Sequence, residues 1–489
     1  MNDSNLTRRE FIRRSSLTGL GLATGLGMTS TMKAENKPSD KWISESAAKI
    51  SKVPTDKRES SALRVSLFDI DATPPVGSQL AYDPMVASWD LSLRAKGIVF
   101  TGAGLPLVIC AVDWIEICNE SYDAFKEALS KGANTTPERV TVHTLHPHDS
   151  VYSDLGAEKI IVSNHQNPGR FESTFQRAFI EKLSKSVADC MKTAVPITHV
   201  GYGKAQVHQV ASSRRVFNAD GTFKDTRYTK CVDPEMRAAP VGLIDPDVDV
   251  VSLWNNDLPV VVMSFYATHP QSYYRTGVAN PDFVGVARFF RQLAVPDALH
   301  IHFNGAGGNI AAGKYNDGAK INRLILAERL AEGMKNAWED TEKIPISADD
   351  LKWKVEKVTF KPALYMPELE KELKNNPVLY GEDVINGKKM AFYKRCKEGK
   401  KLDFECLSFK NIRILFLPAE MGIEFQLAAK AERKDLFVTM AAYGDCGPSY
   451  ISPTHAFSEG GYEVSKIADN TAPDTEQAVL AGIHALLKD

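Results

Sequence analysis

The segment 139–149 reads RVTVHTLHPHD, an apolar, strand-like run that ends in three histidines. Side chains at a strand end are held by a rigid scaffold, so binding and catalytic groups are often found there. His146 and His148 are two residues apart, and an extended backbone would point both to the same face. Neutral imidazole is the commonest transition-metal ligand. The segment therefore predicts either half of a metal site or a polar loop whose histidines close a strand.

From Leu63 onward, strand-like and helix-like segments alternate without a second linker. The patterns predict a hairpin of 98–100 with 107–109, helices over 119–131, 174–192, 282–293, 321–338 and 475–487, and strands over 260–265, 353–360 and 412–417. We expect Asn119 and Asp282 to cap their helices. This mixed order predicts one large α/β (mixed α+β) domain over residues 63–489, with a sub-domain around 350–408 as an alternative.

The N-terminus has the parts of an export signal in the right order. A twin-arginine motif at 7–13 precedes a Gly/Ala/Leu-rich stretch at 17–28 and a small residue at Ala34. The apolar stretch is too short and too glycine-rich to cross a bilayer. We therefore expect a twin-arginine signal peptide at 1–34, a polar linker at 35–62, and a periplasmic or secreted protein.

Charge and cysteine content narrow the classes of partner. Residues 1–34 hold five basic and two acidic side chains, so the rest of the chain carries 54 basic and 59 acidic ones. This acidic balance argues against nucleic acid or an anionic membrane as the main partner. No later apolar run is long enough to span a membrane. The seven scattered cysteines read as buried thiols, with Cys396–Cys406 as one conceivable disulfide.

Four other segments share the pattern of an apolar strand followed by polar or glycine-rich residues: 265–271, 303–313, 417–420 and 443–450. Taken alone, His269 is more often a hydrogen-bonded core residue than a ligand. Glu420 alone reads as an exposed acid at a helix N-terminus. The glycines of 303–313 could present backbone N–H groups to an anion, but Lys314 is misplaced for a phosphate-binding loop.

Together these segments resemble the neutral/alkaline (non-lysosomal) ceramidase family, which consists of secreted zinc amidases. The family's Thr-His-Thr-His-Ser-Gly run is similar to 145–150, and its strand-end Ala-x-His to 267–269. Its Leu-Pro-Gly-Glu is similar to 417–420, and its Tyr-x-x-Tyr-Val-Thr-Thr loop to 450–452. An acidic, tyrosine-containing element resembles 459–463. The order of the motifs matches over residues 63–465.

The resemblance implies a set of site residues. Zn²⁺ would be held by four ligands, His146, His269, Glu420 and Tyr450. His148 would lie beside the metal as a base or proton donor, whereas His143 would be ordinary strand structure. Arg214 resembles the family arginine that lies over the site, although its neighbour Arg215 is the alternative register. Backbone N–H groups of 307–309 could help to stabilise an oxyanion.

Two departures from the family bear on the reaction. The family's catalytic serine aligns with Ala311, whose side chain offers no nucleophile. The sequence ends at Asp489, and we expect that the family's C-terminal β-sandwich domain is absent. The first hypothesis is an exported zinc hydrolase that cleaves an amide (N-acyl) bond by metal-activated water. The alternatives are a zinc hydrolase of a carbohydrate or other non-lipid substrate, and an inactive binding protein that retains the metal. The substrate (lipid, glycan or another small molecule) and the oligomeric state stay open.

Overall fold

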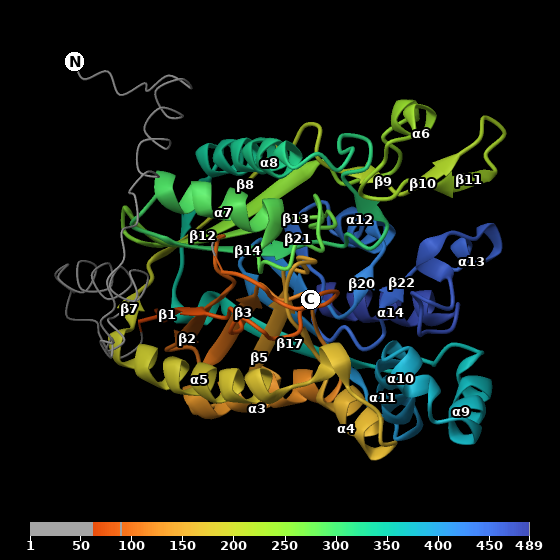
Figure 1. Ribbon diagram of the computed structural model, residues 1–489. Coiled ribbons are helices and arrows are strands. Elements are labelled where there is room, and N and C mark those ends of the chain that lie inside the picture. The colour runs from red at the N-terminus through yellow and green to blue at the C-terminus, as the bar shows by residue number, and fades with distance from the viewer. Residues whose placement is uncertain (1–61, 89, 489) are drawn as a thin grey trace, which may run out of the picture. The chain divides into compact units, whose positions relative to one another are not determined.

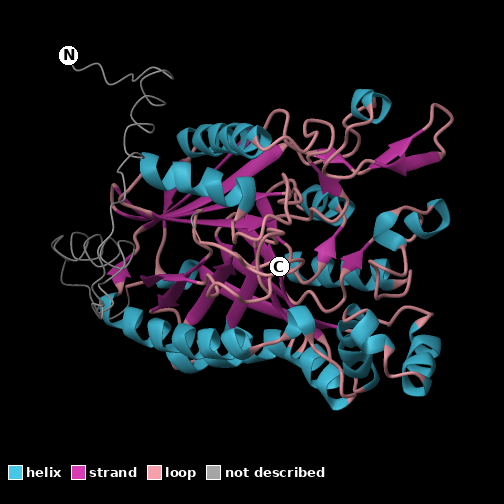
Figure 2. Cartoon of the chain, viewed as in Figure 1, coloured by secondary structure: helices cyan, strands magenta, loops and turns pink. Residues whose placement is uncertain are grey.

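The computed structural model describes residues 62–488 apart from residue 89, and these residues belong to one compact unit. The expected signal peptide at 1–34 and almost all of the expected linker at 35–62 lie outside the described residues. Figures 1 and 2 show a mixed arrangement of helices and sheets, which confirms the predicted α/β class. No helix in the described part is long and apolar enough to span a membrane.

The first sheet carries the histidine segment. Its strand order is β5-β3-β2-β1-β7, with β1 Arg64–Asp71, β2 Arg94–Thr101, β3 Leu107–Val112, β5 Val140–Thr144 and β7 Val195–Pro196. The predicted hairpin is β2–β3, and its turn uses Gly102 and Gly104, both at positive φ. Strands β3 and β5 are parallel. Helices α3 Glu120–Ala133 and α5 Thr174–Cys190 pack on this sheet (Figure 1).

The second sheet has the order β14-β13-β12-β8-β16. Its strands are β8 His199–Gln206, β12 Asp247–Asn255, β13 Leu258–Tyr266, β14 Leu299–Asn304 and β16 Glu342–Pro345. Strands β13 and β14 are parallel. Helices α7 Asp282–Ala294 and α8 Ile321–Glu339 contact this sheet, on the opposite side of the two sheets from α3 and α5 (Figure 1).

The third sheet has the order β17-β18-β19-β21. Its strands are β17 Leu351–Val358, β18 Leu402–Phe409, β19 Ile412–Phe416 and β21 Phe437–Ala441, with β19 and β21 parallel. Helices α12 Ile423–Glu432 and α14 Thr475–Leu487 pack on it. Between β17 and β18 lie α9 Met366–Asn375, α10 Leu379–Glu382 and α11 Ile385–Lys397. The alternative of a separate sub-domain at 350–408 is wrong, because β18 pairs with β19 inside a common sheet.

The remaining elements are short. They include β4 Glu116–Ile117 with β6 Tyr152–Ser153, β9 Ser212–Ser213 with β15 Ile310–Ala311, β10 Arg215–Phe217 with β11 Phe223–Thr226, and β20 Glu420–Met421 with β22 Tyr450–Ile451. The short helices are α4 Leu155–Ser163, α6 Pro234–Ala238, α13 Ala456–Glu459 and the 3-10 turns at 137–139, 169–171, 191–193, 348–350 and 462–464.

One apolar core joins the three sheets. It includes Ile109 from the first sheet, Met263 and Phe303 from the second, and Ile414 from the third. Strand β14 contacts β3 and β5 of the first sheet and β21 of the third. Each sheet contributes one parallel strand pair, and ligand sites of α/β folds lie beyond the carboxyl ends of such strands. The segments that follow β5, β13, β14, β19 and β21 therefore meet in one place.

Two local expectations were wrong. The seven cysteines, all within the described residues, are free thiols, so Cys396 and Cys406 form no disulfide. The side chain of Asn119 does not cap α3, although the helix begins directly after it. Its backbone N–H donates instead to Asp445 Oδ1, and its side-chain amide donates to Asp154. These bonds connect the start of the helix to two other loops.

Buried histidines of the second sheet make the fold sensitive to acid. Burial lowers the pKa of His302, on β14, from the ordinary 6.5 to about 3. A depressed histidine pKa contributes stability that is complete above pH 6.5 and is lost as the pH falls toward 3. Between pH 6.5 and 4.5, His302→Asn should gain about 2–3 kcal/mol of unfolding free energy relative to wild type. Urea unfolding at both pH values measures this difference, and an equal pH dependence in the two proteins would refute it. Substitution of the exposed His208 is the matched control.

Candidate metal centre

The side chains with expected roles converge where the three sheets meet. His146 follows β5, and its N–H donates to Trp114 O at 3.0 Å. His146, Ala419 and Tyr443 all have positive φ, at 61°, 68° and 65°. Such backbone is costly for residues other than glycine and tends to accumulate at functional sites. In the ceramidase-like motif a glycine stands where Ala419 is found here, which fits the left-handed backbone at that position.

Two of the imidazoles are oriented in the same way. His146 Nδ1 lies 2.7 Å from Ile115 O, and His269 Nδ1 lies 3.4 Å from Gly307 O. A carbonyl can only accept, so in the neutral form each Nδ1 carries the proton and each Nε2 carries a lone pair. Backbone carbonyls orient metal-binding histidines in this manner. Both rings therefore present a ligand atom to the same space.

Glu420 faces these two lone pairs. Its Oε2 lies 3.1 Å from His146 Nε2 and 3.7 Å from His269 Nε2, and no hydrogen bond to it is formed within the described residues. All three side chains are buried. Three acceptor atoms around one buried point repel one another unless a proton or a cation lies between them. Nitrogen and carboxylate donors suit Zn²⁺, so the residues present fit the expected metal.

The charges reflect the same arrangement. Burial disfavours both ionised groups, but their mutual attraction raises the pKa of His146 and lowers the pKa of Glu420 relative to their ordinary values. Burial and the neighbouring His146 hold the pKa of His269 and of His148 well below the ordinary value. Glu420 is not the exposed helix-terminal acid that its motif suggests in isolation. It lies in β20, and the first turn of α12 contains Glu424 instead.

Tyr450 completes the predicted ligand set. Strands β20 and β22 pair in parallel with Glu420 opposite Tyr450, so both side chains start from adjacent backbone positions. The Tyr450 ring is nearly parallel to that of His269, with centroids 6.3 Å apart. Its hydroxyl accepts a hydrogen bond from Arg214 Nη1 at 3.1 Å. Burial and Glu420 raise the pKa of Tyr450 well above its ordinary value, whereas Arg214 acts in the opposite direction.

The structure distinguishes the two adjacent arginines. Arg214 contacts Tyr450 and donates to Gly308 O at 2.9 Å, which places it at the centre. Arg215 points away and pairs with Glu459 at 2.7 Å. Glu463 lies between them, 3.8 Å from Arg214 Nε and 3.6 Å from Arg215 Nη1. Of the two adjacent arginines, Arg214 is therefore the one whose side chain reaches the site.

Breaking this buried charge pair should cost stability in a coupled way. Arg214→Met leaves Glu463 partly unpaired, so we expect a loss of about 3 kcal/mol in unfolding free energy. Glu463→Gln removes the stranded charge, and the double variant should recover at least about 1 kcal/mol relative to the sum of the single losses. Denaturant unfolding of the four proteins measures the coupling. Additive losses would show that the two side chains do not interact.

Several site residues have no sequence signal of their own. The Tyr443 ring lies 4.8 Å from that of His146, and its hydroxyl has no partner among the described residues. Glu116 groups with His146 and Glu420, and Lys388 forms a buried ion pair with it. These side chains are brought in by β4, α11 and the loop after β21. Of the three, only Tyr443 lies in a segment, 443–450, that the sequence pattern of a strand followed by polar or glycine-rich residues singles out.

One of the three backbone N–H groups expected to face an oxyanion, at 307–309, is already hydrogen-bonded. The Gly308 N–H donates to Met421 O at 2.8 Å, so it is engaged and not directed at an oxyanion. A Cβ atom at position 308 would lie 2.4 Å from the backbone oxygen of Glu420, so only glycine fits there. Ala311 is buried in β15 and pairs with Ser212. The segment therefore packs closely behind the centre.

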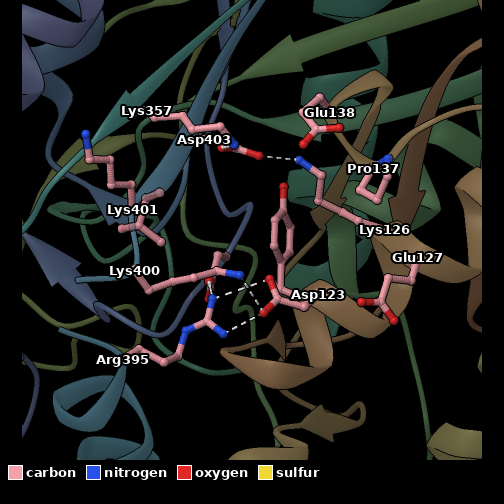
Figure 3. Close-up of a pocket in the computed structure, with 13 residues that line it drawn as sticks. Asp123, Lys126, Glu127, Pro137, Glu138, Lys357, Arg395, Lys400, Lys401 and Asp403 are labelled. Atoms are coloured by element: carbon pink, nitrogen blue, oxygen red, sulfur yellow. Dashed lines mark hydrogen bonds and ion pairs between the residues drawn. The ribbon is translucent and has the colours of Figure 1, made fainter. Parts of the chain in front are cut away.

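A separate cavity of about 220 Å³ lies beside the loop 443–450 (Figure 3). Its lining is charged, and ion pairs such as Arg395–Asp123 and Lys126–Asp403 cross it. Asp445 is in its wall, while Tyr443 and Tyr450 of the same loop face the histidines. These pairs join α3, α11 and β18 around the loop and so help to fix its position.

The arrangement of strands and loops matches known structures. A neutral ceramidase from Pseudomonas aeruginosa aligns at a TM-score of 0.61 and 16% identity, over 87% of this chain and 74% of that chain. A ceramidase complexed with C2 aligns at a TM-score of 0.62 and 15% identity, over 86% and 74%. The chain has a ceramidase-like fold. No protein-family model and no curated protein sequence matches it, so the likeness is one of fold.

Proposed function

We propose that this protein is a zinc-dependent hydrolase whose metal is held by His146, His269, Glu420 and Tyr450. The observation that carries the proposal is the convergence of two oriented Nε2 atoms on Glu420 Oε2, which lacks a hydrogen bond within the described part. Zn²⁺ in such a set supplies Lewis-acid polarisation of a carbonyl and activation of water.

Three surrounding side chains can donate hydrogen bonds to a bound substrate. His148 is buried, and its Nε2 has no partner in the described chain, so a proton on this atom can form a hydrogen bond with the leaving nitrogen of an amide. Arg214 brings a fixed positive charge beside Tyr450, where it stabilises negative charge on a substrate oxygen. The Tyr443 hydroxyl, which has no hydrogen-bond partner among residues 62–488 as described, is a second donor to that oxygen.

We propose an amide (N-acyl) bond as the target. Both aligned structures are ceramidases, and the bond that a ceramidase cleaves is an amide. An amide is therefore the first bond to test. Ala311 offers no hydroxyl, so the attacking group is water and not a side chain. Purified protein should bind one zinc per chain and release fatty acid from a ceramide panel. Turnover without metal would contradict the proposal, and bound zinc without turnover on any panel would favour an inactive binding protein.

A second candidate substrate is a glycan, because tyrosines surround His148. Tyr82 and Tyr274 lie 4.9 Å apart, centroid to centroid, and Tyr274 is 37% exposed. Arg170 lies over the Tyr82 ring, and Arg275 pairs with Asp83 beside them. Flat aromatic faces with nearby charged hydrogen-bonding groups suit sugar rings better than acyl chains. Release of acetate from N-acetylated glycans, with no fatty acid from ceramide, would select this candidate.

We also propose export by the twin-arginine pathway, from the motif at residues 7–13. Replacing Arg8 and Arg9 together by lysine keeps the charge and removes the motif, so the protein should remain in the cytoplasm. Cell fractionation measures this, and the matched control is a substitution of Arg14, outside the motif, by lysine. Unchanged export of the Arg8/Arg9 variant would contradict the assignment.

A further inference from the structure

His148 is held on one side only. Its Nδ1 lies 3.2 Å from Gln271 Nε2 and 3.0 Å from the Tyr82 hydroxyl, whereas its Nε2 has no hydrogen-bond partner within the described residues. The Tyr82 ring is nearly parallel to the imidazole, with centroids 5.6 Å apart. His148, His146 and His269 form one group that could hold a metal, and His146 and Glu420 belong to another. The position of the proton on His148 decides whether its Nε2 can bind a cation in the first group.

The contact with Gln271 settles that position. An amide nitrogen can only donate, so His148 Nδ1 must accept, and the proton of the neutral ring is then on Nε2. A protonated Nε2 can donate to a substrate but cannot bind a cation. The Tyr82 hydroxyl can either donate or accept and is compatible with both tautomers.

We propose that Gln271 is a positioning residue that keeps the His148 proton on Nε2, and so keeps His148 out of the metal's ligand set. The tautomer assignment rests on the hydrogen bonds alone, while its consequence for catalysis rests on the proposed function. Gln271 thereby reserves the third imidazole as a hydrogen-bond donor to the substrate.

The backbone around Gln271 is itself fixed. The Gln271 N–H donates to His269 O at 2.9 Å, and the Thr229 hydroxyl donates to Gln271 O. The next residue, Ser272, donates its N–H to the carboxylate of Asp282 at 3.0 Å. Farther along the loop, Asp149 accepts from the N–H groups of Arg275 and Thr276. With the loop held at both ends, the Gln271 amide has a defined place opposite His148.

Gln271→Glu reverses the hydrogen bond with little change in shape. A carboxylate only accepts, so His148 Nδ1 should gain a proton. Protein labelled with ¹⁵N-histidine reports the protonation of each ring nitrogen by NMR, and a His148→Phe spectrum assigns the signal. We expect Nε2–H with a bare Nδ1 in wild type, in both metal-free and zinc-loaded protein, and a protonated Nδ1 in Gln271→Glu. With an active substrate, kcat should fall by about 100-fold while zinc stays bound.

Two further variants separate the possible causes. Tyr82→Phe retains the Gln271 donor and should keep the wild-type tautomer. Gln271→Leu removes the donor, so a fraction of the His148 rings should carry the proton on Nδ1. A wild-type His148 with Nδ1 protonated, or a Gln271→Leu variant with an unchanged tautomer, would overturn the proposal. Since the NMR readout needs no substrate, loss of the proposed hydrolase activity would leave this test intact.

Discussion

His269→Ala is expected to lower the affinity for zinc by more than 100-fold and to abolish hydrolysis. His269 presents its Nε2 toward Glu420 Oε2 at 3.7 Å and has its Nδ1 on Gly307 O. Removing a partner outside the ligand shell typically costs about 10–100-fold in metal affinity, so removing a ligand should exceed that range. Zinc content after dialysis against a graded chelator measures the loss.

A matched control separates this effect from general damage. His208→Ala alters an exposed histidine and should leave zinc content unchanged. Circular dichroism on the metal-free proteins tests whether His269→Ala is folded, because the variant removes a buried ring. Full zinc retention by a folded His269→Ala protein would exclude His269 as a ligand.

His148→Phe is expected to reduce kcat by about 100- to 1,000-fold while zinc stays bound, since it removes a hydrogen-bond donor to the substrate but no ligand. Phenylalanine preserves a flat ring against Tyr82 and Tyr274, whose centroids lie 5.6 and 5.2 Å from that of His148. Steady-state kinetics together with metal analysis measures both quantities on one preparation.

Measuring kcat and zinc content together distinguishes a role of His148 in catalysis from a role as a metal ligand. If His148 were a third imidazole ligand, zinc would be lost together with activity. If kcat changed by less than about threefold, the hydrogen bond to the substrate would be assigned elsewhere, and Tyr443 would be the next residue to substitute.

Much of the fold follows from local patterns in the sequence. The last helix has the predicted limits, 475–487, because its apolar periodicity covers the whole segment. The predicted 98–100/107–109 hairpin is β2–β3, since two glycines allow the turn. The order of the strands within each sheet was not predictable, because it depends on contacts between distant segments such as β14 with β3, β5 and β21.

The site was predictable only where a side chain directly follows a strand. His146, His269 and Glu420 come two, three and four residues after the ends of β5, β13 and β19, and the structure brings them together, although their role as ligands stays a prediction. Gln271 and Tyr443 gain their places from how loops pack, which no spacing in the sequence records. The exposed position expected for Glu420 was wrong, since β22 pairs with β20 and buries it.

Crystallography of zinc-soaked protein, with anomalous data collected on both sides of the zinc absorption edge, tests the central claim most directly. We predict one strong anomalous peak bonded to His146 Nε2, His269 Nε2 and the Glu420 carboxylate, at the bond lengths of about 2.0–2.2 Å that zinc has with nitrogen and oxygen ligands. Tyr450 would complete the set, and His148 would lie outside it. A peak bonded to His148 in place of Glu420, or no peak among these residues, would contradict the account.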